Sequence, residues 1–259
     1  MKSATKPTDV GTNRTGMKAS PIDAQTMLDG AAADLGILPD GQSLEAVRLA
    51  YSLSAPPLGT MPPPATVRGV AKAALNMARG KDANVFLDLL GERMAFERTG
   101  TRLYEALLVK WDAADSHDGG PDREDLEQIR DDELRHFALC QEAIEQLGAD
   151  ATAVTPSANV VGVAGLGWVQ VLADPRTTLT EGLKVILQAE LVDNDCWLSL
   201  TDLAARLGHD ELAERFRDAL ADEEGHLARV RSWVVEATEV QAGLQARNDG
   251  SGAAVPAPL

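Results

Sequence analysis

Residues 131–140 read DDELRHFALC and residues 221–230 read ADEEGHLARV, so that each segment places a histidine three residues after a glutamate. Residues three apart on a helix share one face, and each pair can therefore contribute to one ligand site. Both pairs also fall within apolar stripes of helical spacing, where an unpaired carboxylate would be costly to bury. Glu133 with His136, and Glu223 with His226, therefore predict a buried site that holds positive charge.

The two pairs belong to a set of long segments rich in Ala, Leu, Glu and Arg, whose composition and spacing predict helices. The predicted helices cover residues 83–111, 121–148, 178–206 and 209–242. Pro121 suits the first turn of the second helix. Thr178 followed by Glu181 resembles a capping box before the third helix, and Gly208 marks the break before the fourth. The long connection at residues 149–177 can travel the length of a bundle, which would make the second and third helices parallel.

The first and third helices also carry acids in mid-stripe, Glu97 in the first and Glu190 with Asp193 in the third. Four glutamates and two neutral imidazoles carry four negative charges, which two divalent cations would balance. Oxygen and imidazole donors suit iron or manganese, whereas a structural zinc more often recruits cysteine. Iron is the first choice and manganese the alternative. The predicted ligands are Glu97, Glu133, His136, Glu190, Glu223 and His226.

With this order of residues, the chain resembles the ferritin-like di-iron carboxylate proteins over about residues 83–242, and rubrerythrin-like chains in particular. The resemblance rests on four segments: FERTGTRLYEAL, DDELRHFALC, LQAELVDND and ADEEGHLARV. It implies an all-α fold, a ferritin-like four-helix bundle with a long crossover between its second and third helices. In that family, Glu133 and Glu223 would bridge or chelate the metals, and Glu97 and Glu190 would be terminal ligands.

The resemblance also implies roles for residues outside the ligand set. DDELRH is similar to an Asp-Glu-x-Arg-His form in which the Asp and the Arg support the ligands, here Asp132 and Arg135. Asp193 stands where rubrerythrin-like proteins have an extra glutamate, and its shorter side chain is expected to orient a histidine rather than to ligate. Tyr104 and Trp197 could carry electrons, although aromatic residues at helical spacing are more often core residues. No rubredoxin-like cysteine pairs are present, so an external electron donor would be needed.

One ligand set supports several chemistries, so function is less determined than the site. The leading expectation is an oxidoreductase in which two ferrous ions reduce O2 or H2O2 while the glutamates shift between bridging and terminal positions. Alternatives are a dimanganese catalase and an iron-binding protein that oxidises and sequesters iron without an organic substrate. A metal-free interaction protein would need the inward acids neutral or paired with arginine, and Arg135 alone cannot serve four of them. A homo-oligomer is compatible with each.

Outside the bundle, residues 1–20 and 243–259 are polar and without periodicity, which predicts mobile ends. Residues 21–82 predict a helical N-terminal extension of unassigned purpose. Its helical patterns are DAQTMLDGAAADLG and TVRGVAKAALNMARG, separated by a proline-rich stretch that cannot continue a helix.

Composition limits the partners and the compartment. Lys and Arg number 24 against 40 Asp and Glu, and the net charge of −16 disfavours nucleic acid as a ligand. The apolar run Asn159–Ala173 is shorter than a membrane span needs, so we expect it to be buried and expect no membrane partner. The N-terminus lacks the apolar segment of a secretory signal, which predicts a cytoplasmic protein. In that compartment Cys140 and Cys196 are expected to be free thiols that pack as small apolar side chains.

Overall fold

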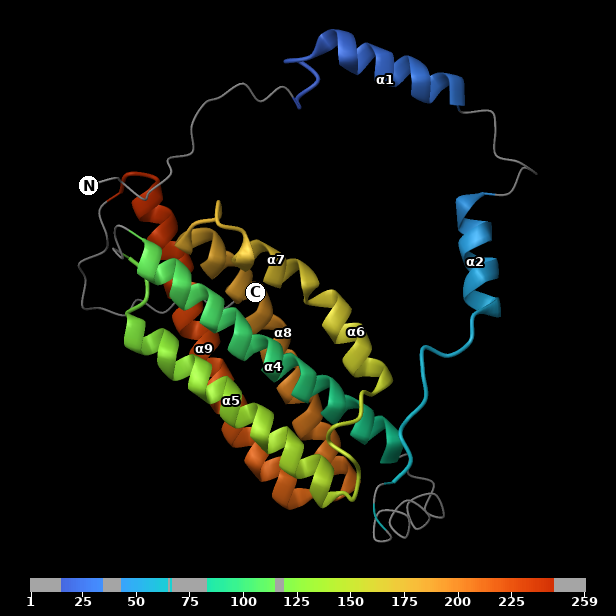
Figure 1. Cartoon of the computed structure of the whole chain (residues 1–259), viewed down its shortest axis with the longest axis vertical. Helices are drawn as coiled ribbons and strands as arrows, with labels where there is room; N and C mark the ends of the chain where they lie inside the picture. The colour runs from blue at the N-terminus through green and yellow to red at the C-terminus, as the bar shows by residue number, and fades with distance from the viewer. Residues whose placement is uncertain (1–14, 35–42, 65, 67–82, 115–118, 245–259) are drawn as a thin grey trace. The chain divides into compact units, whose positions relative to one another are not determined.

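The computed structural model describes residues 15–34, 43–64, 66, 83–114 and 119–244. The chain divides into two compact units, with the boundary between Leu58 and Gly59 in the proline-rich stretch. All the regular secondary structure in the described residues is helical (Figure 1). The all-α prediction is therefore confirmed for this part of the chain.

The N-terminal unit contains helices α1 (Pro21–Asp34) and α2 (Leu44–Ser54). Helix α1 confirms the first predicted helical pattern of the extension. Helix α2 was not predicted, although Ser43 caps it by accepting a hydrogen bond from the backbone of Ala46. The second predicted pattern, residues 66–80, lies outside the described residues apart from Thr66. Residues 1–14 and 245–259, where we expected mobile ends, lie outside them as well.

The second unit is built around four long helices, which confirm the predicted ones within a few residues. They are α4 (Ala83–Ala113), α5 (Arg123–Gln146), α8 (Leu179–Leu207) and α9 (Asp210–Gln241). Thr178 and Glu181 form the expected capping box, and Gly208 ends α8 in the left-handed conformation with φ 85°. Pro121 differs from its prediction, because α5 begins only after the N-cap residue Asp122.

Helix α4 packs against α5 and α8, and α9 packs against the same two helices, so that the four form a bundle. Its apolar core is divided into two clusters. Helices α4 and α9 run from the cluster that contains Phe86 and Phe216 to the one that contains Leu107 and Val230. Helices α5 and α8 run in the opposite direction, and they are therefore parallel to each other, as the long connection predicted.

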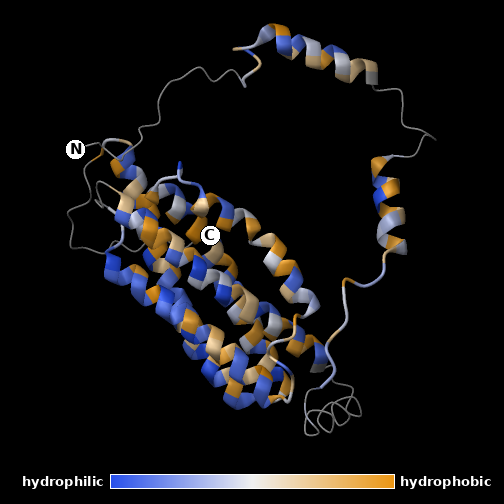
Figure 2. Ribbon diagram, viewed as in Figure 1, coloured by the Kyte–Doolittle hydropathy of each residue, from blue (hydrophilic) through white to orange (hydrophobic). Residues whose placement is uncertain are grey.

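The connection between α5 and α8 contains helices α6 (Pro156–Ala164) and α7 (Leu166–Ala173), which lie along α4 (Figure 1). The expectation that residues 159–173 are buried is wrong. Within the two helices only Leu172 is buried, and Val163 is 70 % exposed, because the segment packs on the outside of the bundle. Figure 2 shows the apolar residues along it. The stretch Pro156–Ala173 also has the length and composition of a membrane-spanning helix, which for a single helix is weak evidence of a span.

Candidate metal centre

A layer of buried polar side chains separates the two apolar clusters of the bundle. All four long helices contribute to it, and each contributes at the point where its stripe of apolar residues is interrupted. Each of these residues is at most 2 % exposed. They are Glu97 from α4, Glu133 and His136 from α5, Glu190 and Asp193 from α8, and Glu223 and His226 from α9.

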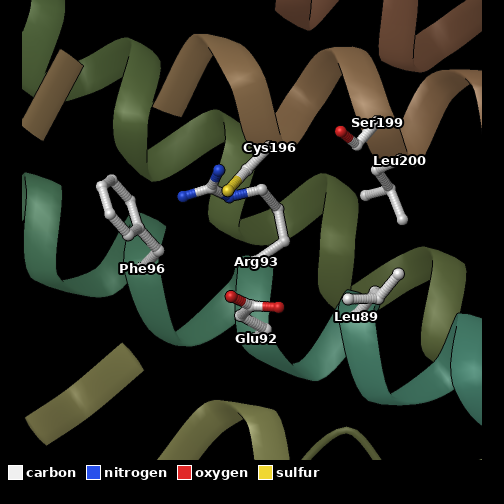
Figure 3. A pocket seen from close by; sticks show the side chains of 7 residues that line it. All are labelled: Leu89, Glu92, Arg93, Phe96, Cys196, Ser199 and Leu200. Carbon is white, nitrogen blue, oxygen red and sulfur yellow. The ribbon is translucent and has the colours of Figure 1, made fainter. Parts of the chain in front are cut away.

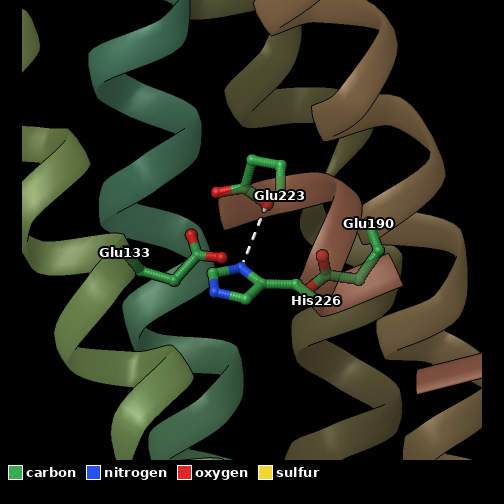
Figure 4. A group of neighbouring side chains, drawn as sticks. All are labelled: Glu133, Glu190, Glu223 and His226. Atoms are coloured by element: carbon green, nitrogen blue, oxygen red, sulfur yellow. Dashed lines mark hydrogen bonds and ion pairs between the residues drawn. The ribbon is translucent and has the colours of Figure 1, made fainter. Parts of the chain in front are cut away.

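The ligand atoms of this layer fall into overlapping groups, and within each group they lie within 4.8 Å of one another. One group consists of Glu133, Glu190, Glu223 and His226 (Figure 4). A second consists of Glu97, His136 and Glu223, and a third of Glu97, Glu133, Asp193 and Glu223. The structure thus brings all six predicted ligands together. Glu223 belongs to every group, and Glu97 and Glu133 each belong to two of them, so these three carboxylates are the ones whose position allows them to be shared between two ions.

Several oxygens in the layer have no hydrogen-bond partner among the described residues. Glu97 Oε2, Glu133 Oε2 and Glu190 Oε2 are buried and accept no hydrogen bond there. Buried polar atoms are nearly always partnered, and an exception needs an explanation. Carboxylate oxygens and imidazole nitrogens are ligands that iron and manganese accept, so the residues present fit a pair of such ions.

Burial shifts the protonation of the acids in the absence of a cation. It raises the pKa of Glu97, raises that of Glu133 and Asp193 strongly, and raises that of Glu190 to about 8. Neighbouring carboxylates act in the same direction. Metal binding would therefore have to displace protons from this layer.

Glu223 and His226 shift the other way from what burial alone would cause. Burial would raise the pKa of Glu223, but hydrogen bonds with His136 and His226 lower it to about 2. Burial would lower the pKa of His226, but hydrogen bonds with Asp132 and Glu223 raise it to about 10. The two side chains therefore form an ion pair, with His226 Nδ1 3.2 Å from Glu223 Oε2.

The histidines are supported from outside the layer by aspartates of the opposite helix. His226 Nε2 lies 3.1 Å from Asp132 Oδ2, and His136 Nε2 lies 3.5 Å from Asp222 Oδ2. Each aspartate directly precedes a glutamate ligand on its own helix. Arg135 pairs with Asp132 and also lies 3.6 Å from Asp222. The structure therefore places Asp132 and Arg135 where the sequence predicted them.

Sequence reasoning missed Asp222, although a signal was present. The two glutamate–histidine motifs both read Asp-Glu-x-x-His, in residues 132–136 and 222–226. Helices α5 and α9 thus each supply two predicted ligands and also the aspartate that contacts the histidine of the other helix. Such partners fix the orientation of a ligating imidazole and leave its second nitrogen facing the metal.

Asp193 contacts an arginine rather than the histidine that we expected it to orient. Arg93, which is 3 % exposed, places Nη1 2.8 Å from Asp193 Oδ1 and Nε 2.9 Å from Glu97 Oε1. Its guanidinium lies 4.1 Å from the ring centroid of Phe96. Sequence reasoning missed this buried cation too, and the available signal was its position one helical turn before Glu97.

Two aromatic residues each donate a hydrogen bond to one carboxylate oxygen, in Glu190 and in Glu97. The hydroxyl of Tyr104 donates a hydrogen bond to Glu190 Oε1, and Trp197 Nε1 donates one to Glu97 Oε1 over 2.9 Å. Both aromatic side chains are fully buried, as core residues would be. They touch the predicted ligands directly, and they leave the second oxygen of each glutamate for another partner.

Gly100 lets α4 and α5 approach each other at the site. A methyl group built on Gly100 would overlap the carboxylate of Glu133. A larger residue at this position would therefore displace a predicted ligand. Spacing along one helix gives no information about such a contact between two helices.

A pocket of about 210 Å³ lies between α4 and α8, with Arg93 among the residues that line it (Figure 3). It is lined by Leu89, Glu92, Arg93, Phe96, Cys196, Ser199 and Leu200. The pocket thus reaches Arg93 but is lined by none of the six predicted ligands. Cys140 and Cys196 are free thiols, as expected, and burial raises the pKa of both.

The candidate metal centre is identified from the positions of its own residues alone. No protein-family model, curated protein or solved structure matches this chain.

Proposed function

We propose that the chain is a ferritin-like protein that binds two iron ions and acts as an oxidoreductase on O2 or H2O2. One observation carries the proposal. Six side chains from four helices, chosen by sequence pattern alone, bring their ligand atoms together in overlapping groups within a buried layer. Helices α5 and α8 are parallel and are joined by a long crossover, which is the connectivity typical of ferritin-like bundles and supports the same proposal.

Bound iron would supply the electrons that reduce the oxidant, and an external donor would restore them. The chain's own residues would bind the ions and orient the side chains that bind them. Glu223, Glu133 and Glu97 each belong to more than one group of ligand atoms and could be shared between two ions. Glu97 and Glu190 each have one oxygen that accepts a hydrogen bond from an aromatic side chain. Asp132 and Asp222 fix the two imidazoles from outside. The apolar clusters on either side keep water away from the layer, which strengthens every electrostatic contact inside it.

Metal content per chain tests the proposal most directly. Protein purified without chelator and loaded anaerobically with ferrous ion should hold about two irons per chain. Glu133→Ala should lose them, because it removes an acid shared by two ligand groups. Glu145→Ala is the matched control, an exposed glutamate on the same helix, and it should keep them. A Glu133→Ala protein that retained both ions and full peroxide turnover would contradict the proposed site.

The same measurement separates the alternatives. Two manganese ions per chain would favour a catalase. Iron far in excess of two per chain, in an assembled shell, would favour sequestration. The metal-free alternative predicts that neither ion binds, and in that case Arg93 and the two histidines would serve as the cations of the layer.

A further inference from the structure

Arg93 introduces a permanent positive charge into a layer that otherwise carries five acids. Those acids are Glu97, Glu133, Glu190, Asp193 and Glu223, all buried. A guanidinium remains protonated at any pH the protein experiences. Arg93 contacts two of the acids directly, and it is itself buried.

The charges of this layer balance only if Arg93 is counted. Five ionised carboxylates and one guanidinium leave four negative charges, with both histidines neutral as metal ligands must be. Two divalent ions supply four positive charges. Without Arg93 the layer would carry five negative charges, and a pair of divalent ions would leave one of them uncompensated in a buried site.

The contacts of Arg93 also determine which acid is withdrawn from the ions. Its Nη1 pairs with Asp193 Oδ1 and also donates a hydrogen bond to the backbone carbonyl of Asp193. Nε binds the oxygen of Glu97 that Trp197 also holds, and leaves Glu97 Oε2 without a hydrogen bond. Arg93 thus neutralises Asp193 and presents Glu97 to the site by one oxygen.

We propose that Arg93 makes this centre selective for a pair of divalent ions over trivalent ions, with Asp193 as its charge partner. The inference rests on the proposed function, because it assumes that the layer binds metal. A fixed positive charge opposes each further positive charge placed beside it. At the effective dielectric constant of about 20 that suits protein sites, one unit charge within several ångströms changes the preference by about tenfold or more. The centre is therefore biased toward its reduced, divalent state.

A charge cycle at two positions tests this. Arg93→Met removes the charge and keeps most of the volume, Asp193→Asn removes its partner, and the double variant restores four negative charges. Each protein is equilibrated with Zn2+ and with Ga3+, both delivered from nitrilotriacetate, and bound metal is measured by mass spectrometry. The ratio of Ga3+ to Zn2+ affinity should rise by about tenfold in Arg93→Met, fall by a similar factor in Asp193→Asn, and return toward wild type in the double variant.

Arg93→Lys is the conservative control and should keep the wild-type ratio even if its packing weakens both affinities. A purely structural role predicts instead that each single variant weakens the affinities for both ions together and leaves their ratio unchanged. If Arg93→Met does not fold, the fall in the ratio of Ga3+ to Zn2+ affinity that is expected in Asp193→Asn still tests the inference. An unchanged ratio in either single variant, or no recovery in the double, would overturn the inference.

Failure of the proposed function would look different. In that case the wild type and Glu133→Ala would bind the same amount of Zn2+, or none. The proposed site and the inference about Arg93 would then both be wrong. If two Zn2+ bind and Glu133→Ala loses them, but the ratio does not follow charge, then only the inference about Arg93 fails.

Discussion

Gly100 is the residue at which α4 leaves room for the carboxylate of Glu133. Gly100→Ala should displace that carboxylate and lower metal content well below that of the wild type, while the helices remain intact. Alanine favours a helix over glycine by about 1 kcal/mol, so stability lost to the clash should be partly regained. Metal content by elemental analysis and helix content by circular dichroism check both parts.

The matched control is Gly225→Ala, which makes the same change within the Glu223–His226 motif. A methyl group there meets nothing within 4 Å. This variant should retain its metal and gain stability by up to about 1 kcal/mol. Equal metal content in the two variants would show that Gly100 does not position Glu133.

Sequence predicted which side chains meet in the polar layer but not all of the residues that support them. The members of the layer were predictable because an acid or histidine in an apolar helical stripe needs a buried partner, and that pattern lies within one helix. Arg93, Gly100 and the link from Asp222 to His136 depend on which residues of two helices meet. Distances of this kind follow from the packing of the helices, and spacing along the chain does not give them.

At the scale of elements, the ends of the helices are set by local chemistry. The capping box of α8 joins the side chain of Thr178 to the backbone of Glu181, and the side chain of Glu181 back to the backbone of Thr178. Thr178→Ala should therefore lower the free energy of unfolding by about 1 kcal/mol. Thr180→Ala, within the first turn of the same helix, is the control. Chemical denaturation of both variants measures the difference, and equal losses would contradict a capping role.

The long helices were predictable because their periodicity extends over many turns and their ends carry strong signals. The exposure of α6 and α7 was not. An apolar run without charges has the same composition whether it lies inside a core or on its outside. Its position follows from the bundle, because α5, α8 and α9 already complete the core around α4 and leave the crossover to lie along the outer side of α4.

At the scale of the whole molecule, the polar layer divides the core, and its protonation links stability to pH. In the metal-free protein Glu190 has a pKa of about 8 against an ordinary value of 4.5, and His226 one of about 10 against 6.5. Between pH 6.5 and 8 the folded state therefore binds more protons than the unfolded state at both positions. Stability should fall as pH rises through this window, at up to about 1.4 kcal/mol per pH unit for each bound proton.

Thermal unfolding at pH 6.5 and pH 8 measures the effect. With chelator present, the midpoint should be lower by several degrees at the higher pH. With Zn2+ bound, the acids are ionised and the histidines neutral at both values, so the fall should disappear or reverse. A metal-free protein equally stable at the two pH values would contradict the predicted protonation of the layer.

The crossed support of the two histidines makes the halves of the bundle depend on each other. The hairpin of α4 and α5 carries Glu97, Glu133 and His136, and the hairpin of α8 and α9 carries the remaining three predicted ligands. Every group of ligand atoms contains residues of both hairpins, and each histidine contacts an aspartate of the opposite hairpin. If the chain were cut in the crossover, neither fragment would keep a complete ligand group. Metal uptake by the mixed fragments would therefore show that the two hairpins had reassociated into the bundle.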